Sequence, residues 1–140
     1  MCSTGHIFFT LLELMEVIQM GGKLYTSYFS NLNNIPKSFR IFSVVRKPQD
    51  LPNIACFAPS AVLLNQYKSK KIEYPEFRRR FLKELESNQV ASETFKSVIN
   101  LIESGTDVVF VCYENKSTYC HRKILGELFQ EAGITYCGEV

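Results

Sequence analysis

The chain has 140 residues, a formal net charge of +2 at pH 7, 46% hydrophobic residues and 21% charged residues. This length fits one domain with a substantial core, and the composition is ordinary for a soluble globular protein. A charge so close to neutral excludes a global electrostatic attraction to nucleic acid or to a membrane surface.

The first 20 residues are largely apolar, but Glu13 and Glu16 interrupt the run. The uninterrupted part is shorter than the roughly 18 to 20 uncharged residues that a membrane span needs. No basic segment precedes it and no small-residue cleavage site follows it, so a signal peptide is not predicted. We expect residues 1–22 to form an N-terminal helix or extension, residues 23–140 to form a single domain, and no membrane association.

Two strands with polar ends are predicted next. The first strand, Leu24–Phe29, is rich in aromatic and hydroxyl-bearing residues, and the second, Phe39–Val45, is followed at once by Arg46. Thr26 and Ser27 are therefore candidate ligand-binding residues, and Arg46 would add a guanidinium at the same rim of the sheet. The alternative is that the hydroxyl groups satisfy nearby backbone groups and that Arg46 is an ordinary surface residue.

Three amphipathic helices are predicted after these strands, over Pro59–Tyr67, Tyr74–Ser87 and Ala91–Ser104. The middle helix carries a run of basic residues interspersed with acids: Arg78, Arg79, Arg80 and Lys83 beside Glu76, Glu84 and Glu86. Such a run is usually a solvated face, so contact with nucleic acid is the less favoured interpretation.

The chain is organised around Asp107–Gly133, which reads as a buried strand, a short polar loop and a helix. Val108–Val111 is a continuous apolar run, as expected for a strand covered on both faces. Ser117 and Thr118 are favourable helix-capping residues, and Ile134–Cys137 reads as a short closing strand. Because strands and helices alternate, we predict an α/β fold: a single three-layer domain with a mainly parallel sheet flanked by helices.

Reactive side chains gather at the predicted strand-to-helix turn: Cys112, Glu114, Cys120, His121 and Arg122. In α/β folds this turn lies at the carboxyl end of the sheet, where ligands bind, and the start of a helix attracts anions. We predict Cys120 as a nucleophile, His121 as a proton carrier and Glu114 as a base. Cys112 and Arg122 are candidate ligand-binding residues, although strand cysteines such as Cys112 are usually inert packing residues.

The cysteines indicate a reducing compartment. There are five of them, an odd number at irregular spacing without a CxxC pair: Cys2, Cys56, Cys112, Cys120 and Cys137. This pattern argues against a disulfide framework and favours the cytoplasm. It also lacks the paired clusters of a structural zinc site, and adjacent Cys and His side chains would diverge on a helix. We therefore expect no metal and no cofactor.

The string DVVFVCYENKSTYCHRKILGELF, in which Cys-His-Arg opens a helix, resembles the signature of domain-of-unknown-function family 488, the YeaO-like bacterial and phage proteins. The strings KLYTSYFSNLNNIP, FRIFSVVRKPQD and CFAPSAVLLNQYK resemble earlier blocks of that family, so the likeness covers about residues 23–140. The resemblance implies a compact α/β domain and a basic group at Arg46. Because the family is defined without a known function, the resemblance leaves the chemistry open.

Three functional hypotheses follow. The first is an enzyme acting on a nucleotide-like or phosphate-bearing substrate, with Arg46 and Arg122 binding the anion. The second is a non-catalytic module that binds the same small anion or a nucleic acid. The third is a structural role, in which Arg122 pairs with Glu114 and the cysteines pack. The spacing from Cys112 to Arg122 does not match the Cys-x5-Arg loop of tyrosine phosphatases and rhodaneses, which counts against their chemistry.

Overall fold

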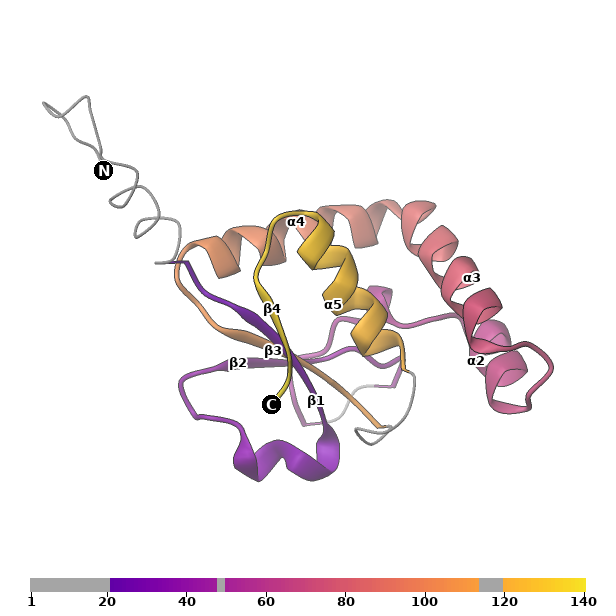
Figure 1. Cartoon of the computed structure of the whole chain (residues 1–140), viewed down its shortest axis with the longest axis horizontal. Helices are drawn as coiled ribbons and strands as arrows, with labels where there is room; N and C mark the ends of the chain where they lie inside the picture. Colours follow the sequence, from indigo (N-terminus) through magenta and orange to yellow (C-terminus); the bar gives the residue numbers. More distant parts are fainter. Residues whose placement is uncertain (1–20, 48–49, 114–119) are drawn as a thin grey trace, which may run out of the picture.

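A four-stranded sheet forms the centre of the protein. The computed structural model describes residues 21–47, 50–113 and 120–140 (Figure 1). The strands are β1 (Leu24–Tyr28), β2 (Arg40–Ser43), β3 (Val108–Cys112) and β4 (Tyr136–Glu139). They lie in the order β2-β3-β1-β4, and every pairing is parallel. The predicted α/β fold with a parallel sheet is therefore confirmed.

The register brings the carboxyl ends of the strands to one edge of the sheet. Tyr28 of β1 lies opposite Cys112 of β3, and Ser43 of β2 lies opposite Val111. Strand β4 continues beside β1, where Glu139 pairs with Thr26. Polar residues that are distant in the sequence therefore come together at this edge.

Helices cover one face of the sheet. These helices are α2 (Ala61–Lys68), α3 (Tyr74–Glu86), α4 (Gln89–Glu103) and α5 (His121–Glu131), with the short 3₁₀ helix η2 (Ala55–Phe57) beside them. The 3₁₀ helix η1 (Phe29–Asn34) lies on the other side of the sheet (Figure 1). Phe29 and Leu32 of η1 pack with Val109 and Val111 there. The domain thus has three layers, and the layer on the η1 side is thin.

The core lies between the sheet and the helices. Phe57, Phe110 and Phe129 are almost fully buried, and their rings meet edge to face with centroids 5.5–6.1 Å apart. Burying each such side chain contributes about 1.5–3 kcal/mol to folding. This core fixes α5 against β3, and so it also sets where the end of β3 lies relative to the start of α5.

A side-chain cap sets the start of α2. Ser60 caps α2 by accepting a hydrogen bond from the Leu63 N–H at 3.2 Å, so this helix begins two residues after the expected Pro59. Helix α5 begins at His121 with Cys120 as its N-cap, while Ser117 and Thr118 fall outside the described residues.

Strand β4 lies two residues beyond the predicted Ile134–Cys137, because its pairing with β1 begins at Tyr136, opposite Leu24. Of the extension predicted for residues 1–22, residues 1–20 are outside the described part of the chain. Among the described helices, none combines the length and apolar character needed to cross a bilayer.

Candidate functional site

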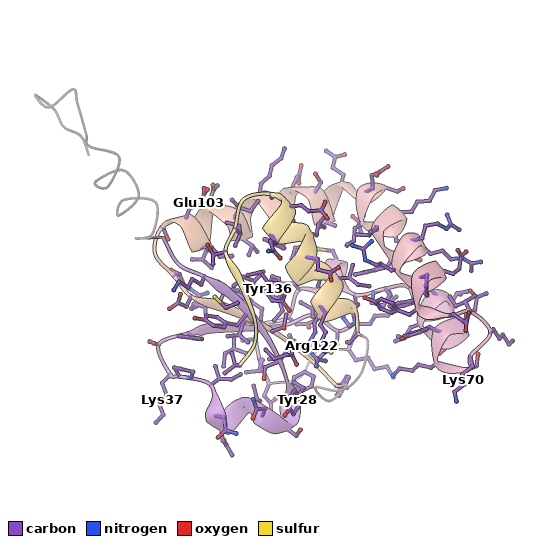
Figure 2. The ribbon with its side chains drawn as sticks, viewed as in Figure 1. Tyr28, Lys37, Lys70, Glu103, Arg122 and Tyr136 are labelled. Atoms are coloured by element: carbon purple, nitrogen blue, oxygen red, sulfur yellow. The ribbon has the colours of Figure 1, made fainter. Side chains whose placement is uncertain are left out.

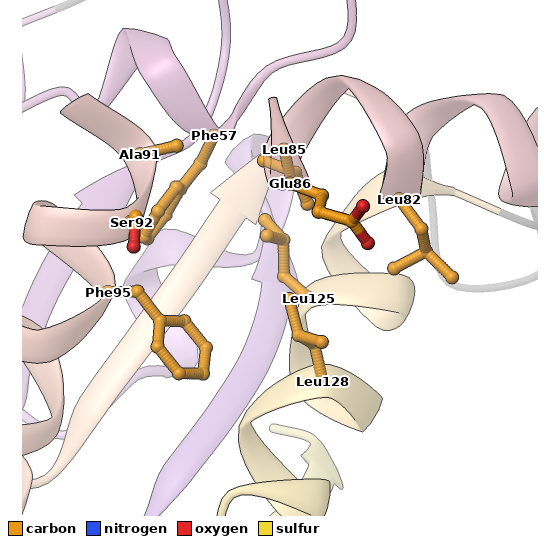
Figure 3. Close-up of a pocket in the computed structure, with 9 residues that line it drawn as sticks. All are labelled: Phe57, Leu82, Leu85, Glu86, Ala91, Ser92, Phe95, Leu125 and Leu128. Carbon is orange, nitrogen blue, oxygen red and sulfur yellow. The ribbon is translucent and has the colours of Figure 1, made fainter. Parts of the chain in front are cut away.

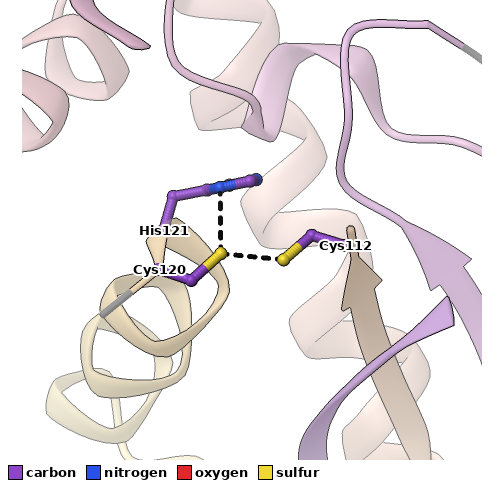
Figure 4. A group of neighbouring side chains, drawn as sticks. All are labelled: Cys112, Cys120 and His121. Carbon is purple, nitrogen blue, oxygen red and sulfur yellow. Dashed lines mark hydrogen bonds between the residues drawn. The ribbon is translucent and has the colours of Figure 1, made fainter. Parts of the chain in front are cut away.

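Cys112, Cys120 and His121 form a buried group that we call the thiol–imidazole cluster (Figure 4). Cys112 is the last residue of β3, and Cys120 and His121 stand at the start of α5. The two sulfur atoms are 2.7 Å apart, and His121 Nδ1 lies 3.5 Å from Cys120 Sγ. The side chains are at most 4% exposed. The structure therefore brings together three of the residues that the sequence predicted for the site.

The backbone at Cys120 explains how two adjacent side chains can meet. Cys120 precedes the helix and has extended geometry, with φ of −135° and ψ of 154°. The expected divergence of Cys120 and His121 assumed that both residues were helical. With Cys120 extended, its sulfur and the His121 ring lie on the same side, facing Cys112 (Figure 4).

The His121 ring is held in one orientation by the segment after β2. Its Nε2 lies 2.5 Å from the Val44 carbonyl oxygen, which can only accept, so Nε2 carries the hydrogen. The Val44 N–H donates to the Val111 oxygen of β3, and Asn53 bonds both backbone groups of Val45. In a neutral ring, Nδ1 is then the unprotonated nitrogen, and it faces Cys120.

Arg122 joins the cluster to the C-terminal strand. Its guanidinium is fully buried and forms a bidentate ion pair with Glu139, through N···O distances of 3.2 and 2.8 Å. Its Nη1 also donates to Cys112 Sγ at 2.9 Å. The guanidinium carbon lies 5.7 Å from the centre of the Tyr28 ring (Figure 2). Arg122 thus places a positive charge against one of the two sulfur atoms.

A hydroxyl network supports this ion pair. Thr26 is fully buried, and its hydroxyl donates to Glu139 and lies 2.7 Å from the Tyr136 hydroxyl. Because the single Thr26 hydrogen goes to Glu139, the Tyr136 hydroxyl donates to Thr26. Ser27 is also buried, and its oxygen accepts a hydrogen bond from Asn31 at 3.1 Å. Thr26 therefore belongs to the same polar network as Arg122, whereas Ser27 bonds toward η1.

The charges of the site shift the pKa values of its groups. The hydrogen bond with Cys120 and then burial raise the pKa of Cys112, although the Arg122 cation opposes this change. Burial alone would lower the pKa of Arg122, but its bonds to Glu139 and Cys112 raise it overall. Burial would raise the pKa of Glu139, but the bonds from Arg122 and Thr26 lower it. The buried ion pair therefore stays charged, while Cys112 holds its proton.

Of the two remaining predicted residues, Arg46 is not part of this group. Arg46 is exposed, and its Nη1 lies 3.5 Å from the Pro59 carbonyl oxygen. It lines a hollow of about 400 Å³ with residues that include Ser60 and Glu84, and no member of the thiol–imidazole cluster lines that hollow. Glu114 is outside the described residues.

An apolar pocket lies elsewhere, between α3, α4 and α5 (Figure 3). Its volume is about 420 Å³, and its lining is mostly aliphatic and aromatic: Phe57, Leu82, Leu85, Glu86, Ala91, Ser92, Phe95, Leu125 and Leu128. No member of the thiol–imidazole cluster lines it. This pocket therefore adds no chemistry to the site.

Sequence reasoning missed Glu139 and Tyr136 as parts of the site. Their contacts with Thr26 and Arg122 depend on the pairing of β4 with β1. A signal was present, because the carboxyl ends of parallel strands share an edge and an acidic residue at the end of the closing strand could have been placed there. Among the described residues, the carboxylate bonded to Arg122 is Glu139.

These features define an α/β domain in which thiol, imidazole and guanidinium groups meet at the end of a parallel sheet. The chain belongs to the DUF488 family: the model named DUF488-N3a, described as the active DUF488-N3 subclade, matches residues 25–133. The match includes the turn from Cys112 to Arg122 and ends before Glu139. Searches of curated proteins and of solved structures gave no match.

Proposed function

We propose that this protein is an enzyme acting on a nucleotide-like or phosphate-bearing substrate, with its reacting groups in the thiol–imidazole cluster. The observation that carries the proposal is the fixed His121 ring, which presents Nδ1 to Cys120 Sγ while Nε2–H is bonded to the Val44 oxygen. A nitrogen base held against a thiol is the arrangement that generates a thiolate.

The surroundings of Cys120 also provide a positive electrostatic potential. Cys120 stands at the N-terminus of α5, an 11-residue helix, where the helix dipole stabilises negative charge. Arg122 places a buried positive charge against the neighbouring sulfur, and the Cys112 thiol can donate its hydrogen to Cys120. A thiolate serves an enzyme either as a nucleophile or as a metal ligand, and both roles are compatible with this environment.

Two further considerations support the substrate class and the catalytic role. The N-terminus of α5, where the helix dipole is positive, suits a substrate that carries negative charge, such as a phosphate ester or a nucleotide. The family description of the matched subclade as active is consistent with catalysis. Glu114 remains a proposed base, and Arg46 a proposed contact for the substrate anion.

A product screen tests the proposal. The reduced full-length chain is incubated with nucleotides, sugar phosphates and short oligonucleotides, and products are detected by liquid chromatography and mass spectrometry. We expect turnover of at least one compound, and a loss of about 100-fold or more in Cys120→Ala and His121→Gln variants with unchanged circular dichroism.

A thermal-shift measurement on the same panel separates the competing roles. If a compound stabilises the chain but is never converted, the protein is a non-catalytic binding module and the enzyme proposal is refuted. Neither turnover nor stabilisation with any compound would overturn both proposals and leave the structural role of the cluster.

A further inference from the structure

We propose that Cys112, Cys120 and His121 bind a divalent metal ion of the zinc type through their two sulfur atoms and Nδ1. This inference rests on the proposed function, which places the reaction at the thiol–imidazole cluster, and it deepens that proposal by naming the class of cofactor. Both cysteines are then ligands of the ion. The nucleophile is then a water molecule on the ion, because three protein ligands leave the fourth tetrahedral position open.

The donor atoms have the type that such an ion requires, and one of the distances between them already fits. Thiolate sulfur and imidazole nitrogen are preferred zinc ligands, and these three donor atoms all lie within 4.8 Å of one another. Bond lengths of about 2.3 Å to sulfur and 2.0–2.1 Å to nitrogen place tetrahedral S···N pairs about 3.5 Å apart. The distance from Cys120 Sγ to His121 Nδ1 is 3.5 Å.

The two sulfur atoms would have to move apart. They are 2.7 Å apart, whereas two sulfur ligands of a tetrahedral zinc ion lie about 3.8 Å apart, which requires an opening of about 1 Å. Cys112 ends β3 and Cys120 directly precedes α5, and both residues are buried in the core. The separation on binding therefore requires small shifts where β3 ends and α5 begins.

The second shell has the pattern of a metal site. A metal-bound histidine usually donates its other ring N–H to a carbonyl or carboxylate, which fixes the ring and leaves the ligating nitrogen unprotonated. His121 makes this bond to Val44 through Nε2. Arg122 Nη1 donates to Cys112 Sγ at 2.9 Å, as expected for an N–H group that supports a ligating thiolate.

The charges of the buried cluster also balance once an ion is included. Two thiolates offset a divalent cation, and Arg122 and Glu139 offset each other in their ion pair. A neutral sum matters here because an uncompensated charge at a buried site costs several kcal/mol. Without the cation, two thiolates this close together would repel each other.

Metal analysis of the full-length chain tests the inference. After expression in zinc-supplemented medium and purification under reducing conditions, inductively coupled plasma mass spectrometry should find close to one zinc per chain. Cys112→Ser and Cys120→Ser should each lose most of that zinc. Cys56→Ser and Cys137→Ser are matched controls, because neither residue belongs to the cluster, and they should retain it.

Cobalt substitution provides the second measurement. The chain is stripped with a chelator and loaded with Co²⁺, and it should show a sulfur-to-cobalt charge-transfer band with the strong visible absorption of a tetrahedral site. His121→Gln should weaken Co²⁺ binding at least tenfold while its circular dichroism stays unchanged.

Three results would overturn the inference. One is a metal-free, reduced chain that shows no cobalt band. The second is equal zinc content in the cluster variants and the matched controls. The third is an isolated chain with Cys112 and Cys120 joined in a disulfide, shown by peptide mapping.

The inference and the proposed function fail separately. If a chain shown to be metal-free converts a compound, the metal site is refuted, and the enzyme uses a thiolate as its nucleophile. If the chain binds the ion but converts no compound, the metal site is supported and the proposed enzymatic function is refuted.

Discussion

Replacing Glu139 by Gln removes the carboxylate that neutralises the buried guanidinium of Arg122. Arg122 is fully buried, and the Glu139 side chain is 23% exposed. Removing one partner of a fully buried ion pair costs about 3–5 kcal/mol, because the remaining charge is left uncompensated. Glu139 keeps some contact with water, and Gln retains one oxygen that can accept a hydrogen bond. We therefore expect the free energy of unfolding to fall by about 2–3 kcal/mol.

Urea denaturation followed by circular dichroism measures this change directly. In thermal unfolding of a chain of this size, about 3 °C of melting temperature corresponds to 1 kcal/mol, so the melting temperature should fall by about 6–9 °C. The matched control is Glu127→Gln, which removes the ion pair with Arg78, where the side chains are 49% and 36% exposed. Exposed pairs contribute about 0–1 kcal/mol. Equal losses in the two variants would refute the reasoning from burial.

The effect of Glu139→Gln should also depend on pH. The pKa of Glu139 is lowered from its ordinary value of 4.5, so its charged form stabilises the folded state. That contribution is complete above the unfolded-state pKa and is lost as the pH falls through the lower folded-state pKa. The difference in unfolding free energy between wild type and variant should therefore be constant at neutral pH and should shrink below pH 4.5. A difference that grows on acidification would contradict this assignment.

Three further substitutions have defined outcomes. Gly126→Ala should lower stability by about 1–3 kcal/mol in urea denaturation, because the added methyl group overlaps the ring of Tyr136; an unchanged midpoint would show that the ring moves freely. Ser60→Ala should cost about 1–2 kcal/mol in the same assay, since Ser60 caps α2 and donates to Glu84, and a loss near zero would refute the capping role. Cys120→Ser should lower the pKa of Cys112, measured by thiolate absorbance with the other cysteines replaced, and a higher value would contradict the hydrogen bond as its cause.

Most of the fold could be predicted from the sequence, because each strand or helix is indicated by a pattern within its own segment. The apolar run over Val108–Val111 matches the buried β3, and the amphipathic pattern over Tyr74–Ser87 matches α3 within one residue. The first residue of α5 was harder to predict from the sequence. Its start depends on the extended backbone of Cys120, and no side-chain cap marks this residue. The end of the last strand depends on its pairing with β1.

Only part of the site could be predicted from the sequence, because some of its contacts join residues that are far apart along the chain. The cluster of Cys112, Cys120 and His121 follows from one strand-to-helix turn, and the sequence located it. The bond from His121 to the Val44 carbonyl and the ion pair from Arg122 to Glu139 depend on how β2 and β4 are placed in the sheet. A pattern that describes one segment at a time cannot contain such contacts.

The claim that the thiol–imidazole cluster holds the reacting groups is tested most directly by one substitution made at two cysteines. Cys120 is 2% exposed within the cluster, whereas Cys137 is exposed on β4. On the first compound that the protein converts, kcat/KM should fall about 100-fold or more in Cys120→Ser and should stay within about twofold of wild type in Cys137→Ser. Equal values of kcat/KM in the two variants would contradict the account.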